Sequence, residues 1–120
     1  MEDWECHAVG RSWKNKKGEF HREDGPAVIY NNGIVEWWWN GMRHRLDGPA
    51  IDRLEGYTEE IEWARIWCRY GQIHREDGPA VERNNGTVRW YWNGKELPIT
   101  SLEELEALKP ELIVEDIQEM

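Results

Sequence analysis

The amino-acid sequence predicts a mainly β fold, an antiparallel meander of repeated β-hairpins followed by one or two short C-terminal helices. Three observations support this prediction. A heptapeptide, His-Arg-x-Asp-Gly-Pro-Ala, occurs three times in 120 residues. Strand-like runs joined by Asn-Gly turns lie between its copies. Nine tryptophans argue against a disordered chain and supply much of the area that a sheet of this kind can bury.

The repeats divide the chain into units. The heptapeptide begins at His21, His44 and His74. After the first and third copies come a short run, an Asn-Asn-Gly turn and a tryptophan-rich run, so each unit is expected to hold one hairpin. The expected hairpin-repeat domain spans 1–97, with units of about 1–20, 21–43, 44–73 and 74–97, and an acidic helical segment spans 98–120.

Alternation along the tryptophan-rich runs predicts which face of the sheet is buried, because side chains two residues apart share a face. Two matching sets form the expected core face: Val35, Trp37 and Trp39, and Val88, Trp90 and Trp92. Trp38 and Tyr91 then lie on the opposite face. Trp38 is either exposed there as an interface residue or covered by the C-terminal helix, and the sequence leaves both possibilities open.

The middle unit departs from the pattern. Its first part is longer, and Cys68 and Arg69 take the places of Trp38 and Trp39. The insertion is either a longer hairpin, whose second strand extends over 59–69, or a loop on a binding face.

The C-terminal segment carries helix signals. Ser101 is the expected N-cap and Glu104 completes a capping box, with leucines at helical spacing through Leu108. Pro110 is expected to end or kink this helix, and residues 112–117 to form a second short helix or a strand.

The charge balance narrows the classes of partner. With 24 acidic and 15 basic side chains, the formal net charge is -9, which argues against direct nucleic-acid binding and favours a basic protein surface. No apolar run reaches the roughly 20 residues of a membrane helix. Cys6 and Cys68 make no disulfide framework, so we expect a reducing, cytoplasmic location.

From about residue 13 to residue 97, the alternation of His-Arg-x-Asp-Gly-Pro-Ala with Trp-x-Trp-Asn-Gly resembles the degenerate MORN-like repeats of small proteins from tailed bacteriophages. The resemblance implies β-hairpin units that act as scaffolds and interaction surfaces, without catalytic residues. It also implies a phage-encoded inhibitor of a bacterial defence system or host enzyme, acting in the cytoplasm of the bacterial host.

The recurring histidine and aspartate are the candidate catalytic or metal-binding residues: His21 with Asp24, His44 with Asp47, and His74 with Asp77. Repetition favours a structural role, in which the aspartate bonds the turn and the histidine packs across it, because catalysis needs one site whereas every unit needs a turn. We therefore expect no enzymatic activity, no metal and no cofactor.

The leading hypothesis is a non-enzymatic protein-binding module that occludes a partner's surface or mimics nucleic acid. Its expected contacts are aromatic anchors and acidic side chains: Trp38, Tyr91, Glu59, Glu60, Glu103, Glu104 and Glu106.

The alternative is a protein that sequesters a nucleotide-like small ligand through stacking and positive charge, with Arg65, Arg69, Arg89 and Trp67 as its candidate binding residues. Cross-strand pairing of these arginines is the simpler account. Homo-oligomerisation through an exposed sheet edge also stays open.

Overall fold

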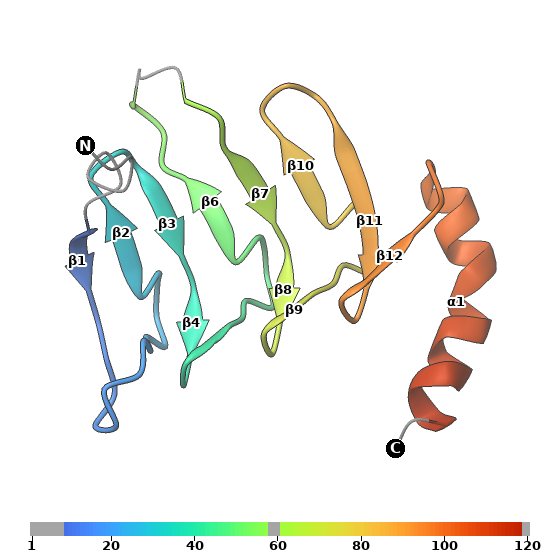
Figure 1. Ribbon diagram of the computed structural model, residues 1–120, viewed down its shortest axis with the longest axis horizontal. Coiled ribbons are helices and arrows are strands. Elements are labelled where there is room, and N and C mark those ends of the chain that lie inside the picture. Colours follow the sequence, from blue (N-terminus) through green and yellow to red (C-terminus); the bar gives the residue numbers. More distant parts are fainter. Residues whose placement is uncertain (1–8, 58–60, 119–120) are drawn as a thin grey trace.

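The computed structural model describes residues 9–57 and 61–118, which form twelve strands and one helix (Figure 1). The elements are β1 (Val9–Ser12), β2 (Val28–Tyr30), β3 (Ile34–Glu36), β4 (Trp38–Trp39), β5 (Met42–Arg43), β6 (Ile51–Arg53), β7 (Ala64–Ile66), β8 (Cys68–Arg69), β9 (Gln72–Ile73), β10 (Val81–Arg83), β11 (Val88–Trp92), β12 (Lys95–Leu97) and α1 (Leu102–Gln118). The predicted mainly β fold is confirmed.

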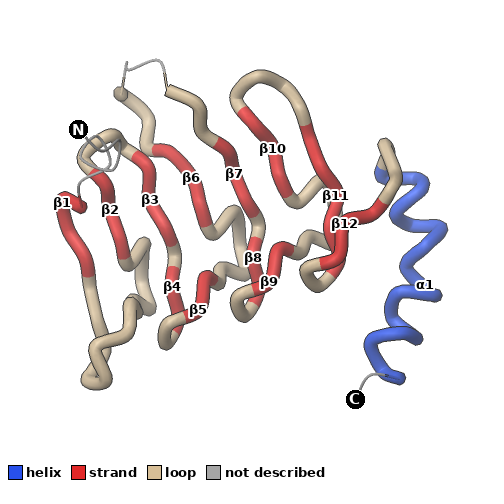
Figure 2. Tube along the Cα trace, viewed as in Figure 1, coloured by secondary structure: helices blue, strands red, loops and turns tan. Residues whose placement is uncertain are grey.

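The strands form a meander in chain order. Eight of them pair antiparallel in the order β1-β2-β3-β6-β7-β10-β11-β12, while β4 pairs with β5 and β8 pairs with β9 in two short separate ladders. Figure 2 shows these short ladders along one side of the main sheet, and α1 beside β12 at one end. Units 21–43 and 44–73 therefore hold a second, shorter hairpin besides the single hairpin that the repeat predicts, whereas in the last unit β11 runs on to pair with β12 in the main sheet.

The Asn-Gly turns that follow the tryptophan-rich runs, and the Tyr-Gly turn of the middle unit, have positive φ angles. Asn40 and Asn93 adopt φ of 46°, each followed by a glycine at 83°. The middle unit has Tyr70 at φ 49° in this position. Asparagine tolerates the left-handed region, whereas a bulky side chain there is an outlier. The Asn-Gly turns are thus confirmed, and the middle turn is strained.

The sheet buries side chains on both faces, so the expectation of a single core face is wrong. Val35, Trp90 and Trp92 are buried as expected, but Trp39 and Val88 are exposed. The register places another row on the opposite face, which we call the inner face: Val28, Glu36, Ile51, Ile66 and Val81. Three of its members, Val28, Glu36 and Val81, are buried.

The strands of units 21–43 and 44–73 break at the tryptophan position, whereas β11 runs unbroken from Val88 to Trp92. Trp37 lies between β3 and β4, and Trp67 lies between β7 and β8. Alternation does not run continuously through these residues, so the expected long strand over 59–69 is replaced by β7 and β8. Cys6, Glu59 and Glu60 lie outside the described residues.

The C-terminal segment is one helix, and the expected separate element at 112–117 is wrong. Ser101 is confirmed as the N-cap, since its Oγ accepts the Glu104 N–H at 3.2 Å, and Glu104 Oε1 accepts the N–H of Thr100, one residue before the cap, at 3.2 Å. The helix continues through Pro110 to Gln118. Its two buried leucines, Leu105 and Leu112, lie on either side of the proline, and this packing offsets the proline's local cost.

The helix completes the hydrophobic core at the end of the sheet. Leu105 and Leu112 cluster with Trp90, Trp92 and Leu97, and the Trp92 indole N–H donates to Asp116 at 2.8 Å. Figure 1 shows α1 beside β12 and away from β4. The possibility that this helix covers Trp38 is therefore wrong. Among the described residues, no helix combines the length and apolarity needed to cross a bilayer.

Replacing Leu105 with alanine is expected to destabilise the fold by about 2–5 kcal/mol, because the fully buried side chain leaves a cavity between the helix and the last hairpin. Urea unfolding would measure the loss. Ile113→Ala on the exposed side of α1 is the control and is expected to change stability by no more than about 0.5 kcal/mol. Equal effects would show that α1 does not pack as described.

Candidate functional site

Each heptapeptide arginine joins its loop to the preceding hairpin. The Arg45 guanidinium lies 3.8 Å from the ring centre of Trp37, within the range of a cation–π interaction. Its Nε donates to Asp47 at 2.9 Å, and its Nη1 donates to the Pro49 carbonyl at 3.1 Å. Arg22 over Trp13 and Arg75 over Trp67 repeat this arrangement. The aspartate therefore holds the arginine, a role that the sequence analysis did not predict.

The stacked arginine restricts the glycine of the heptapeptide, and burial restricts its alanine. A Cβ atom at Gly48 would lie 2.9 Å from the Arg45 guanidinium carbon, which is too close for ordinary packing. The corresponding distance is 2.8 Å at Gly78, and at Gly25 it is 3.1 Å, which is tight but less restrictive. The closing alanines, Ala27, Ala50 and Ala80, are fully buried and bond the strands of neighbouring hairpins through their backbone.

Each heptapeptide histidine joins its loop to the following turn. The Tyr70 N–H donates to His44 Nδ1 at 2.9 Å, and the two ring centres are 4.1 Å apart. His21 and His74 likewise accept the N–H groups of Asn40 and Asn93, beside the rings of Trp39 and Trp92. These contacts support the structural interpretation of the repeated histidine and aspartate. In the part of the chain that the structure describes, no group of three or more ligating side chains is placed to hold a metal ion.

The third position of the heptapeptide differs between copies. Glu23 Oε2 lies 3.6 Å from His21 Nε2, and Glu76 Oε2 lies 3.2 Å from His74 Nε2. The middle copy has Leu46, which offers no acceptor and is 66% exposed. Burial and then the nearby Arg69 guanidinium lower the pKa of His44 below its usual value of 6.5. The middle unit thus replaces a charged contact with an exposed apolar side chain.

An open groove of about 590 Å³ lies between the first two heptapeptide loops, and we call it the middle groove. Trp37, Trp39, Leu46 and Tyr70 contribute its apolar and aromatic surface. Tyr70 is 63% exposed, and Leu46 and Trp39 are exposed as well. The carboxylates of Glu23, Asp24 and Asp47 line the same groove. The middle groove therefore combines exposed aromatic and aliphatic side chains with acidic groups.

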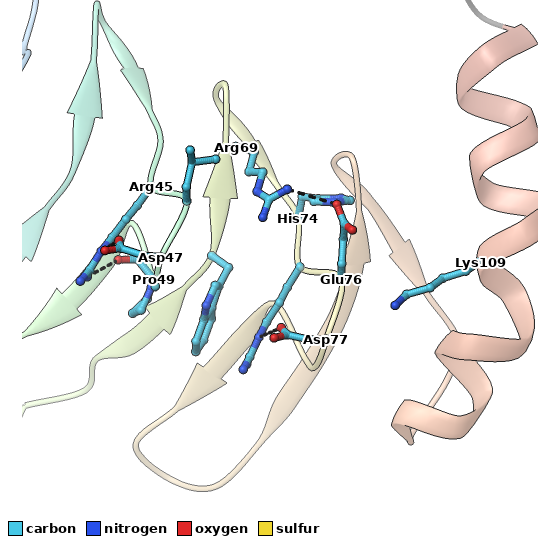
Figure 3. Close-up of a pocket in the computed structure, with 12 residues that line it drawn as sticks. Arg45, Asp47, Pro49, Arg69, His74, Glu76, Asp77 and Lys109 are labelled. Atoms are coloured by element: carbon cyan, nitrogen blue, oxygen red, sulfur yellow. Dashed lines mark hydrogen bonds and ion pairs between the residues drawn. The ribbon is translucent and has the colours of Figure 1, made fainter. Parts of the chain in front are cut away.

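A second groove of about 750 Å³ lies between the second and third heptapeptide loops, and its charges are paired (Figure 3). Arg69 Nη1 lies 3.1 Å from Glu76, and Arg75 Nε lies 2.9 Å from Asp77. Figure 3 shows Lys109 of α1 pointing toward the loop that carries these carboxylates. This second groove offers fewer apolar contacts than the middle groove.

Trp38, a predicted partner anchor, is half-buried on the inner face. The buried Glu36 carboxylate accepts the Trp38 indole N–H at 3.0 Å, the Tyr30 hydroxyl at 3.3 Å and Arg43 Nη2 at 3.2 Å. Burial and then Glu36 raise the pKa of Tyr30. The Phe20 ring centre lies 5.4 Å from that of Trp38. These contacts give Trp38 a structural role.

The other predicted partner residues are not gathered around Trp38. Tyr91 is half-buried in β11. Glu103 is exposed in the first turn of α1, Glu104 belongs to the helix cap, and Glu106 accepts from Lys109 Nζ at 2.7 Å. Glu59 and Glu60 are not among the described residues, so their position stays a prediction.

The predicted ligand residues are separated by the sheet. Arg65 pairs with Asp52 at 3.0 Å, and Arg89 pairs with Glu96 at 2.9 Å. The register places Arg89 on the inner face and Arg65 on the opposite one. Trp67 and Arg69 line the second groove together, although Arg75 lies over the Trp67 ring at 3.8 Å.

Sequence reasoning missed Leu46 and Tyr70. A comparison of the repeat copies would have identified both residues. Leu46 occupies a position that is glutamate in the other copies, and Tyr70 occupies a position that is asparagine in the other copies. The structure brings both deviations to the middle groove. No protein-family model, curated protein or solved structure matches the chain.

Replacing Trp38 with phenylalanine is expected to destabilise the fold by about 1–3 kcal/mol, because the buried Glu36 carboxylate loses its indole donor. Chemical denaturation would measure this. Tyr91→Phe, at the corresponding position of the third copy, removes a hydroxyl with no described hydrogen bond and is expected to have little effect. A neutral Trp38→Phe variant would contradict the structural role.

The lowered pKa of His44 predicts a loss of stability in mild acid. The folded state favours the neutral ring, so this contribution is complete above pH 6.5 and is lost as the pH falls through the lower folded-state pKa. Urea midpoints between pH 8 and pH 5 would show the loss. His44→Asn keeps a side-chain acceptor for the Tyr70 N–H and is expected to have a weaker pH dependence than the wild type. Identical profiles would exclude His44 as the source.

Proposed function

We propose that this chain is a non-enzymatic protein-binding module and that the middle groove is its binding surface. The supporting observation is the pair of deviations in the middle unit, Leu46 and Tyr70, which line that groove. Exposed aliphatic and aromatic side chains that meet at one place are typical of protein interfaces.

The two deviations are costly for the isolated protein. A large side chain in the left-handed region costs about 1–2 kcal/mol, and asparagine at the same position in the other units reduces this strain. The contact between the Tyr70 and His44 rings explains why position 70 holds an aromatic residue. It does not explain why the Tyr70 side chain is exposed. Leu46 likewise gives up the glutamate contact of the other copies. A binding role accounts for both residues.

In this proposal the module acts by occluding a surface of its partner. The resemblance to phage repeat proteins extends the proposal to a phage-encoded inhibitor of a bacterial defence system or host enzyme, acting in the host cytoplasm. The net charge of -9 favours a partner with a basic surface. Nucleic-acid mimicry by acidic residues is a variant of the same proposal.

Sequestration of a nucleotide-like ligand is the second candidate, and one observation favours it. Trp67 and Arg69 line the second groove, whose volume is in the range of small-molecule sites. Its arginines already pair with carboxylates, however, and the Trp67 ring lies under Arg75. Mass spectrometry of the purified native protein would detect a bound nucleotide.

Two variants copied from the other repeat units test the binding surface. Leu46→Glu and Tyr70→Asn restore the residues of the first and third copies, so both are expected to be at least as stable as the wild type, and Tyr70→Asn is expected to gain up to about 1–2 kcal/mol from the relief of backbone strain. Each is expected to reduce capture of the partner from bacterial lysate at least tenfold, because each removes an exposed contact from the middle groove. Quantitative mass spectrometry of the captured fractions would measure this.

Leu54→Glu is the matched control, because Leu54 is an exposed leucine that does not line the middle groove. This variant is expected to capture the partner as the wild type does. Thermal unfolding of all three variants separates lost binding from lost folding. Full capture by folded Leu46→Glu and Tyr70→Asn would overturn the proposed surface.

A further inference from the structure

The ion pairs beside the middle groove expose their negative members and cover their positive ones. The Asp24 and Asp47 side chains are each 86% exposed, whereas those of Arg22 and Arg45 are 27% and 22% exposed. Each guanidinium lies against a tryptophan ring and is held by the loop. A partner in the groove therefore meets carboxylate oxygens more readily than positive charge.

Two aromatic rings in the same groove have no cation over them among the described residues. The described arginine–ring contacts involve Trp13, Trp37, Trp38, Trp63 and Trp67. Trp39 and Tyr70 contact histidine rings instead and remain exposed. Exposed aromatic faces attract guanidinium groups, and Arg is the cation most often found in such contacts.

The protein itself shows what such a combination binds. In each repeat, an arginine lies on an aromatic ring and donates to an aspartate. The middle groove presents the same two elements, an aromatic ring and a carboxylate, with the ring exposed. Leu46 adds an apolar contact beside them, which suits the aliphatic part of an arginine or a neighbouring apolar residue.

We propose that the middle groove binds an arginine of a partner protein, within a segment that also carries an apolar side chain. The arginine stacks on Tyr70 or Trp39 and pairs with the outward carboxylates of Asp24 and Asp47, while the apolar side chain contacts Leu46. This inference rests on the proposed function, since it names the chemistry of the partner at the same groove. The exposed carboxylates of Asp24 and Asp47 give the groove the charge that complements an arginine.

The probe is the peptide acetyl-Leu-Arg-Leu-Arg-Leu-amide, compared with the same peptide in which citrulline replaces both arginines. Citrulline keeps the shape of arginine but has no charge. Titrations followed by NMR are expected to shift the Trp39 indole and Tyr70 ring signals with the arginine peptide, and the citrulline peptide is expected to bind at least tenfold more weakly. Trp39→Phe assigns the indole signal.

Two isosteric variants form a matched pair. Asp47→Asn and Asp77→Asn each keep a side-chain oxygen for the neighbouring arginine Nε, but only Asp47 lines the middle groove. Asp47→Asn is expected to weaken arginine-peptide binding severalfold, whereas Asp77→Asn leaves it unchanged. Equal effects of the two variants, equal binding of the citrulline peptide, or no shift at Trp39 and Tyr70 would each overturn the inference.

The outcomes also separate this inference from the proposed function. If Leu46→Glu and Tyr70→Asn abolish partner capture but the arginine peptide does not bind the groove, the surface is right and the partner chemistry is wrong. If the arginine peptide binds through Asp47 while both groove variants capture the partner fully, the arginine site is right and the proposed interface is wrong.

Discussion

The arginine that lies over the tryptophan ring of the preceding hairpin makes the contact on which the repeat depends. A meander of short hairpins has little depth in which to build a core, and much of this sheet has no second layer described over it. The arginine covers the indole, and its aspartate and proline partners fix its position. Trp90, in the last hairpin, has no heptapeptide after it, and there α1 packs against the ring instead. The helix thus replaces the missing fourth loop.

The contacts of the loop, the stacked arginine among them, give a role to each of the six heptapeptide positions that recur. Histidine accepts from the following turn, arginine and aspartate form the stacked pair, glycine leaves room for the guanidinium, proline supplies a carbonyl, and alanine fits a fully buried site. The third position alone varies, as Glu23, Leu46 and Glu76. Packing does not require a leucine there. Because packing does not explain the leucine at position 46, its presence there supports a role in binding.

Local chemistry made the meander, the turns and the helix cap predictable, because Asn-Gly pairs and the Ser101–Glu104 capping box act over a few residues. The predictions failed for features that depend on contacts between residues far apart in the sequence. Trp38 lies on its expected face, but its partial burial depends on the buried Glu36, and the helix passes Pro110 because leucines on both sides pack against the sheet. The sequence alone identified the candidate ligand-binding arginines. Which carboxylates they pair with, and on which face of the sheet each lies, depends on the strand register. Leu46 and Tyr70 were detectable by comparing copies, although only the structure places them in one groove.

The spacing of the repeat favours surface occlusion over nucleic-acid mimicry by the heptapeptide loops. Successive loops precede β2, β6 and β10, which are two strands apart in the sheet. Neighbouring strands lie about 4.8 Å apart, so equivalent aspartates recur roughly every 10 Å. Duplex DNA carries about one charge per 1.7 Å of its axis, a far denser array. Widely spaced carboxylates around an apolar groove instead match separate basic side chains on a protein surface, and the middle unit is where the apolar contacts are added.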